Sequence, residues 1–238
     1  MNQVFQIQKF LQHQGKANAK FLTTNDDKMR SQYLYEVAEG VELLKIGIVY
    51  GSNASGKTTL LDALAFFRRT MLDKPENKNM GMGYVPFLLD NHSRKEHSSM
   101  QMTFWLNREK YILSLEFDEK RIYEETLMVY TSSRPTKLYN RSYQQETDHS
   151  EVTFGSKSGI NKATQRAIAG NTTNNCTVMA AFGQSNAATS RLNIVAEFFY
   201  SGMRDTLSPR DSLTFNVKDE LRHDKEDKKK HFLLQMLK

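Results

Sequence analysis

Hydrophobic and polar residues alternate through the middle of the chain. Residues 101–106 and 111–117 place apolar side chains at every second position, and residues 122–130 form a third strand-like segment. Short polar segments at 107–109 and 118–120 separate the three. Residues 137–141 and 151–154 add two shorter segments of the same kind. Such alternation with tight polar turns is typical of antiparallel strands that have one buried face and one exposed face. The pattern predicts an antiparallel β meander.

The first fifty residues also favour strands. One is expected to begin at Val4, a second covers residues 33–37, and a third runs from Leu43 to Tyr50. The end of the third, residues 45–50, is mostly apolar, which predicts a short buried strand.

Helical spacing follows at residues 59–69. This helix is expected to end near Met71, because Pro75 cannot continue it. Residues 73–83 are rich in Asn, Lys, Gly and Pro, and we expect a mobile loop there.

The period changes again from residue 161, and residues 161–204 are expected to form helices. Residues 208–210 interrupt them, and a last helix is expected at roughly 216–237. The helical spacing is carried by four apolar residues, which are Leu192, Val195, Ala196 and Phe199.

A glycine-rich loop separates the apolar segment 45–50 from the helix that follows it. The residues from Gly51 to Thr58 match the phosphate-binding pattern G-x-x-x-x-G-K-[ST] at every fixed position, in a strand–loop–helix context. The expected nucleotide-binding residues are Gly51, Ser52, Asn53, Ala54, Ser55, Gly56, Lys57, Thr58 and Thr59.

Each fixed position of the loop has an expected role. Gly51 is expected to take a backbone conformation closed to other residues, and Gly56 to let the backbone approach the phosphates. The amides at the helix start would form an anion cradle. Lys57 would reach the β- and γ-phosphates, and the Thr58 hydroxyl would ligate Mg²⁺.

Composition narrows the class of protein. No apolar run approaches the length of a membrane span, and the first residues lack the pattern of a secretory signal. The single cysteine, Cys176, excludes an internal disulfide framework and fits a reducing compartment, so we expect a cytoplasmic protein with no membrane partner. We expect Cys176 to be a packed side chain. The net charge of +6 is compatible with a nucleic-acid partner and equally with solvated surface.

Other catalytic patterns are weak. Residues 113–119 resemble an apolar strand that ends in an acidic Mg²⁺ ligand, but polar residues interrupt it with period two, so we interpret Asp118 and Glu119 as a hairpin turn. Ser52 and Ser55 have no His–Asp partner in the motif, which argues against acyl transfer. The six histidines lack metal-ligand spacing and are expected at the surface: His13, His92, His97, His149, His223 and His231.

The segment from Gly51 to Leu64 resembles the G-x-N-x-S-G-K-[ST]-x-L-[LI]-x-A-[LI] segment of bacterial AAA-type ATPases, whose nucleotide domains are built like those of SMC, RecF and ABC proteins. Residues 7–10, 85–90 and 134–141 are also similar to this family. The resemblance implies ATP and Mg²⁺ as cofactors and a homodimer for the intact protein. It also implies a place in phage defence or abortive infection, with DNA or an effector nuclease as partner.

The resemblance also has a gap. In the family, the signature motif, the Walker B acid and the switch histidine lie in a C-terminal half, and we find none of them in this sequence. The expected fold is therefore an α/β P-loop NTPase head of the ABC/SMC-like type, N-terminal portion only, with an antiparallel β lobe and a C-terminal helical lobe. Within residues 1–238, the P-loop core is expected at 1–72, the β lobe at 84–155 and the helical lobe at 160–238.

Two functions remain open. The first is an ATP-binding protein and nucleoside triphosphate hydrolase, whose Walker A loop holds the phosphates and whose hydrolysis requires elements supplied by the full-length protein. That activity is expected to serve anti-phage defence or a DNA-related process. The second is a truncated, hydrolysis-incompetent binding module that acts on a partner protein or on DNA.

Overall fold

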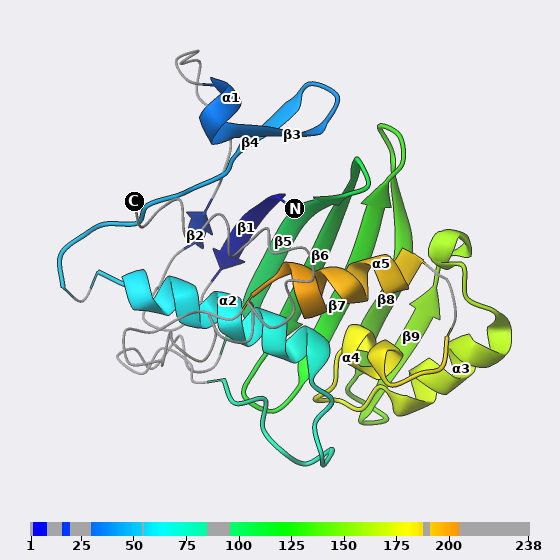
Figure 1. The fold of residues 1–238 in the computed structure, drawn as a ribbon. Coiled ribbons are helices and arrows are strands. Elements are labelled where there is room, and N and C mark those ends of the chain that lie inside the picture. Colours follow the sequence, from blue (N-terminus) through cyan, green and yellow to red (C-terminus); the bar gives the residue numbers. More distant parts are fainter. Residues whose placement is uncertain are drawn as a thin grey trace, which may run out of the picture. The chain divides into compact units, whose positions relative to one another are not determined.

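A seven-stranded antiparallel sheet organises the part of the chain that the computed structural model describes, namely residues 2–8, 16–19, 30–53, 55–84, 96–187 and 191–204. Its strand order is β2-β1-β5-β6-β7-β8-β9 (Figure 1). The strands are β1 (Asn2–Gln8), β2 (Lys16–Ala19), β5 (Ser98–Leu106), β6 (Glu109–Phe117), β7 (Ile122–Tyr130), β8 (Pro135–Gln144) and β9 (His149–Phe154). Strands β5 to β9 pair in chain order, which confirms the predicted meander.

The N-terminal strand joins this meander from a distant part of the sequence. Strand β1 pairs antiparallel with β5, from Asn2 opposite Trp105 to Gln8 opposite Ser99. The sheet therefore combines segments from both sides of the phosphate loop.

One face of the sheet is the core of the protein. Side chains along β5 and β6 alternate between buried and half-exposed, and helix α2 (Lys57–Leu72) packs on the buried face with Phe66, Phe67 and Met71 (Figure 1). The rings of Phe66 and Phe117 stack with centroids 5.2 Å apart. Burial of each such side chain stabilises the fold by about 1.5–3 kcal/mol, so α2 is fixed firmly to the sheet.

Short helices complete the cover of this face. They are α3 (Lys162–Asn171), α4 (Val178–Gly183), α5 (Arg191–Glu197) and a π-helical turn, η3 (Phe198–Gly202). Asn161 and Thr177 cap α3 and α4 with side-chain oxygens. Leu192, Val195 and Phe199 are buried, as their spacing predicted. The interruption at 208–210 and the helix at 216–237 lie outside the described residues.

Residues 1–204 form one compact unit. The predicted boundaries at residues 1–72, 84–155 and 160–238 stay a prediction. None of the described helices is long and apolar enough to cross a membrane.

A small hairpin precedes the phosphate loop. It consists of β3 (Leu34–Ala38) and β4 (Val41–Leu44), after a single turn of helix, α1 (Arg30–Tyr33). Its buried residues, Val37 and Leu43, pack with the partly buried Trp105 of β5.

The predicted buried strand at residues 45–50 is wrong. Strand β4 ends at Leu44, and residues 46–50 have no strand assignment and pair with none of the described strands. Ile46, Ile48, Val49 and Tyr50 are 66%, 84%, 60% and 91% exposed. An apolar segment of this kind is buried only when strands flank it on both sides, and every described strand pairs antiparallel with other partners. The physical reason is therefore the lack of neighbouring strands among the described residues.

A buried polar cluster ties the sheet to α4. The Glu125 carboxylate of β7 is fully buried and accepts hydrogen bonds from the Val178 amide at 2.8 Å and the Tyr139 hydroxyl at 2.7 Å. Burial raises the pKa of Glu125 above its usual value, although the charge of Arg141 opposes this change. The contact places a carboxylate at the start of α4, where unpaired amides need an acceptor.

Candidate functional site

The glycine-rich loop leads directly into the first turn of α2 (Figure 1). Gly51, Ser52, Asn53 and Ser55 are exposed, and Ala54 lies outside the described residues. No side chain caps the first turn of α2, so the amides at the helix start stay open to a ligand. The helix begins at the motif lysine, two positions earlier than the spacing predicted.

Gly56 sets the direction in which the helix starts. Its φ of 86° and ψ of 11° lie in the left-handed region, and it occupies the N-cap position of α2. A side chain at this position would strain the backbone. The motif therefore needs glycine here for its conformation, in addition to the close phosphate approach that the sequence predicted.

Gly51 is required for a different reason from the predicted one. Its φ does not lie in the positive range, so the expected special conformation is wrong. Instead, a Cβ on Gly51 would lie 2.7 Å from the Ser55 hydroxyl oxygen. The loop is folded so tightly that its first and fifth residues touch, and the Ser55 amide donates to the Ser52 carbonyl at 3.3 Å.

Lys57 lies across the loop. Its ammonium donates hydrogen bonds to the carbonyls of Gly51 at 2.7 Å and Ser52 at 2.6 Å, and it contacts the Ser55 hydroxyl at 3.4 Å. These contacts hold the ammonium against the loop carbonyls. A lysine held in this way can exchange a carbonyl contact for a phosphate oxygen without a change of backbone.

Thr58 and Thr59 occupy the first turn of α2, and Thr58 is exposed. A threonine hydroxyl at this position fits the Mg²⁺ role that the motif predicts, because hard cations prefer oxygen ligands. No group of three or more His, Cys, Asp or Glu residues that could hold a metal occurs among the described residues.

The residues of the weaker catalytic patterns lie where the sequence predicted. Residues 113–119 lie in β6 and the turn after it, where the Asp118 carboxylate accepts hydrogen bonds from the Lys120 and Arg121 amides at 2.7 Å. The hairpin interpretation is confirmed. His97 and His149 are exposed, and the other four histidines lie outside the described residues. Cys176 is 1% exposed, and burial raises the pKa of its thiol to about 11, so it is a packed side chain.

Sequence reasoning missed the buried polar groups of the β lobe. Glu125 and Arg141 are both fully buried on neighbouring strands. The signal for Glu125 was present, because it shares the period-two face of Leu127 and Val129. Arg141 follows no apolar alternation that would have marked it as buried.

The glycine-rich loop lies within a segment that matches a known protein family. Residues 47–150 match AAA_21, a family described as "AAA domain, putative AbiEii toxin, Type IV TA system". The matched segment starts just before the phosphate loop and extends through α2 and strands β5–β8 to the start of β9. Searches of curated proteins and of solved structures found no match. Residues 47–150, which are less than half of the chain, are thus similar to this AAA-domain family of P-loop proteins.

Proposed function

We propose that the chain binds ATP with Mg²⁺ at the Gly51–Thr59 loop and forms part of a nucleoside triphosphate hydrolase. The observation that carries this proposal is the placement of Lys57 across an open loop at the start of α2. The family match supports nucleotide binding in general, and the choice of ATP rests on the sequence resemblance.

The physical argument concerns the charge of the triphosphate. Amides at a helix start and one ammonium can hold phosphate oxygens that water would otherwise solvate. Gly56 starts α2 in a left-handed conformation with no side-chain cap, and the Lys57 ammonium lies within hydrogen-bond reach of the loop carbonyls. Binding then requires only that the lysine exchange one set of oxygen atoms for another.

The test is ATP binding measured by calorimetry with the wild-type chain and two lysine variants. Lys57→Ala is expected to weaken binding on the order of a hundredfold, because loss of one preorganised charged donor costs about 3 kcal/mol in such sites. Lys45→Ala is the matched control, because Lys45 also donates to a backbone carbonyl, that of Ser31 at 3.1 Å, but lies outside the loop. Equal ATP affinity of wild type and Lys57→Ala would refute the proposal.

The role of Thr58 is tested separately. Thr58→Ala is expected to remove the Mg²⁺ dependence of ATP binding, whereas Thr58→Ser keeps a hydroxyl and should retain it. If all three proteins respond to Mg²⁺ alike, the metal is held by other groups.

Hydrolysis needs groups beyond those described. The acidic candidate in β6 is a hairpin turn, and no acidic metal cluster occurs among the described residues. The exposed apolar segment 46–50 supports a site completed by further strands, because a βα phosphate loop normally follows a strand of a parallel sheet. We propose that these strands bring the missing Mg²⁺ ligand and the group that activates water.

The rival function is a binding module without turnover. It is favoured by the absence of a Walker B strand among the described residues. Mg²⁺-dependent phosphate release by the 238-residue chain, abolished by Lys57→Ala, would exclude this rival. ATP binding without phosphate release would favour it.

The biological setting remains a proposal as well. The family match supports a link to toxin–antitoxin systems. From the sequence resemblance, we propose a defence role for a cytoplasmic homodimer that acts with DNA or an effector nuclease. Dimerisation is checked by the mass of the chain in solution with and without ATP. The defence role is checked by comparing phage growth on bacteria that express wild type or Lys57→Ala.

A further inference from the structure

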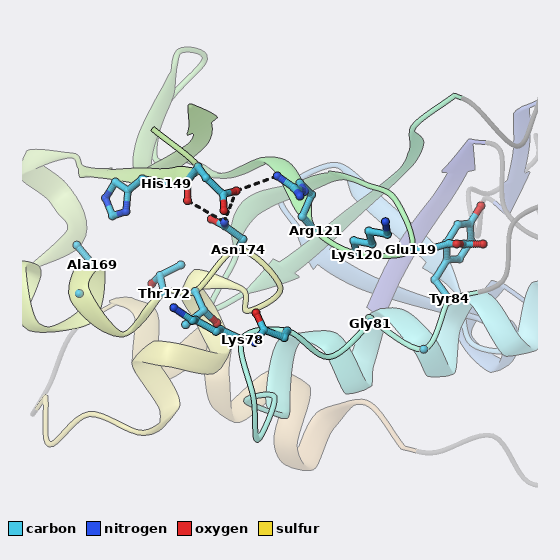
Figure 2. A pocket seen from close by; sticks show the side chains of 15 residues that line it. Lys78, Gly81, Tyr84, Glu119, Lys120, Arg121, His149, Ala169, Thr172 and Asn174 are labelled. Atoms are coloured by element: carbon cyan, nitrogen blue, oxygen red, sulfur yellow. Dashed lines mark hydrogen bonds and ion pairs between the residues drawn. The ribbon is translucent and has the colours of Figure 1, made fainter. Parts of the chain in front are cut away.

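A polar cleft of about 870 Å³ lies at the end of the sheet where β6 turns into β7 and β8 into β9. The end of α3 and the loop after α2 form its other walls, and none of its lining residues belongs to the phosphate loop. Figure 2 shows Arg121 and Lys120 on the β6–β7 side, with Lys78 on the loop across the cleft.

Asp148 fixes one wall of the cleft. Its carboxylate accepts hydrogen bonds from Arg121 at 3.0 Å and from the Asn174 amide at 3.1 Å (Figure 2). It also accepts one from the Tyr143 hydroxyl at 2.8 Å. The Arg121 guanidinium also lies over the Tyr143 ring, 4.7 Å from its centroid. Arg121 is therefore held in one place, and its charge is matched by Asp148.

Buried side chains of the sheet hold Asn174 in place through hydrogen bonds. Arg141, which is fully buried, donates to the carbonyls of Thr173 at 3.1 Å and Asn174 at 2.8 Å. Ser150 donates to the side-chain oxygen of Asn174 at 2.9 Å. The position of Asn174 is thus set by the sheet before any ligand arrives.

The facing loop is anchored too. The Asn175 amide, 3% exposed, donates to the carbonyls of Asn77 and Met80 at 2.9 Å. The Met82 amide donates to the Glu119 carbonyl at 2.9 Å. These bonds tether the segment that the sequence predicted to be mobile, and they hold the two sides of the cleft at a fixed separation.

Two lysines on these anchored segments have no bonding partner among the described residues. The ammonium groups of Lys78 and Lys120 make no hydrogen bond or ion pair with any residue that the structure describes. Since Asp148 offsets Arg121, the carboxylate of Glu119 is the remaining negative charge among the lining residues. The cleft therefore carries a net positive charge on a preorganised frame.

The lining also indicates which kind of anion fits. Small-molecule pockets are mostly apolar and enclosed, whereas this cleft is lined largely by charged, amide and hydroxyl groups. Tyr84 is its single Phe, Tyr or Trp residue, and it is 8% exposed, with its hydroxyl bonded to Ser98. It therefore offers no face on which a base could stack, and the exposed His149 imidazole is the remaining ring among the lining residues. With one accessible ring and two ammonium groups, the recognition is expected to be mainly of phosphates.

We propose that this cleft binds the phosphodiester backbone of a nucleic-acid strand through Lys78, Lys120 and Arg121, with little sequence preference. The proposal is independent of ATP binding. The net charge of +6 on the whole chain favours the approach of such a polyanion.

The test measures the polarisation of a short labelled single-stranded oligonucleotide as the full chain is titrated at several salt concentrations. The double variant Lys78→Gln/Lys120→Gln is compared with Arg134→Gln/Lys157→Gln, which removes the same charge. The control residues lie at or beside the β7–β8 turn, where Lys157 bonds Thr131, and neither lines the cleft. Melting curves verify that both doubles are folded.

We expect oligonucleotide binding to weaken in the cleft double variant and not in the control double variant. The cleft double should bind the oligonucleotide about tenfold more weakly, and its slope of log affinity against log salt should fall by roughly 1.4, because each single-strand phosphate contact contributes about 0.7. The control double should keep the slope of wild type, and Lys57→Ala should bind like wild type.

Equal weakening of oligonucleotide binding in the two double variants would overturn the proposal, and so would unchanged binding by the cleft double variant. Displacement of the oligonucleotide by polyglutamate as readily as by unlabelled DNA would also overturn it. The last would identify an acidic polypeptide as the partner. Loss of binding in Lys57→Ala alone would assign the oligonucleotide to the phosphate loop instead.

Discussion

The Arg68 side chain of α2 donates a hydrogen bond from its Nε to the Phe199 carbonyl at 3.1 Å, across 131 positions of sequence. The same nitrogen donates to Met203 at 2.6 Å, and Nη2 reaches Tyr200 at 3.4 Å. The helix that starts at the phosphate loop thus holds the C-terminal carbonyls of the π-helical turn η3.

Loss of this contact is expected to destabilise the chain. Arg68→Ala should lower the free energy of unfolding by about 2 kcal/mol, because hydrogen bonds from a charged donor are worth about 1.5–3 kcal/mol. Arg68→Lys should recover only part of the lost free energy of unfolding, since an ammonium cannot reproduce the planar arrangement of the guanidinium donors. Urea unfolding gives the values, and Arg134→Ala in the exposed β7–β8 turn is the neutral control. If Arg68→Ala and Arg134→Ala have the same free energy of unfolding, the Arg68 hydrogen bonds to η3 do not stabilise the chain.

Substitution of Gly56 by alanine is expected to affect both stability and ATP binding. Gly56→Ala should cost about 1–2 kcal/mol of stability from its left-handed backbone and should also weaken ATP binding. Gly40→Ala provides a control, because Gly40 has a φ of 68° but no atom within 4 Å, so it should share the stability cost without the binding defect.

Gly51→Ala is expected to weaken ATP binding through its contact with Ser55. The double variant Gly51→Ala/Ser55→Ala removes the hydroxyl that lies 2.7 Å from the new Cβ, and it should regain part of the affinity. If the second substitution gives no rescue, the contact is not the reason for glycine at this position.

The exposed segment before the loop makes a separate prediction. Ile48 is 84% exposed, so Ile48→Ser should change the free energy of unfolding by less than about 0.5 kcal/mol. Leu113→Ala in β6, with no exposure, should cost about 2–5 kcal/mol. The serine variant should also bind less of a hydrophobic dye. A large loss of stability in Ile48→Ser would mean that the segment is covered in solution.

Cys176 gives a pH-dependent prediction. Burial raises the pKa of its thiol from 9.0 to about 11, so the folded chain favours the protonated form. This contribution to stability is complete below pH 9.0 and is lost as the pH rises toward about 11. The free energy of unfolding of wild type, relative to Cys176→Ala, should therefore fall across that window.

Thiol reactivity checks the same burial. At pH 8 the native thiol should react with a thiol reagent at least on the order of a hundredfold more slowly than the thiol in urea, because its thiolate fraction is lower by that factor. Equal rates in the native and unfolded chain would show that Cys176 is accessible.

Local patterns explain why much of the fold was predictable. The meander follows from period-two alternation, and α2 follows from helical spacing between the motif and Pro75. The assignment of Asp118 to a turn depended on the same alternation. Such features are set by interactions between residues close in sequence, so they can be recognised without the tertiary structure.

Other features depend on contacts between distant segments. Burial at residues 45–50 would require flanking strands, and the apolar pattern alone does not reveal whether those neighbours are present. The polar cleft unites Lys78, Arg121 and Asn174 from three separate segments, none of which carries a motif.

The glycine-rich motif, the helix after it and the antiparallel meander could be recognised from the amino-acid pattern, because each depends on spacing within a short window. The burial of Glu125 and Arg141, the pairing of β1 with β5 and the exposure of Ile48 became visible in the folded chain. Those outcomes depend on which surfaces meet when the chain folds, and the burial of a side chain is a property of its neighbours in space.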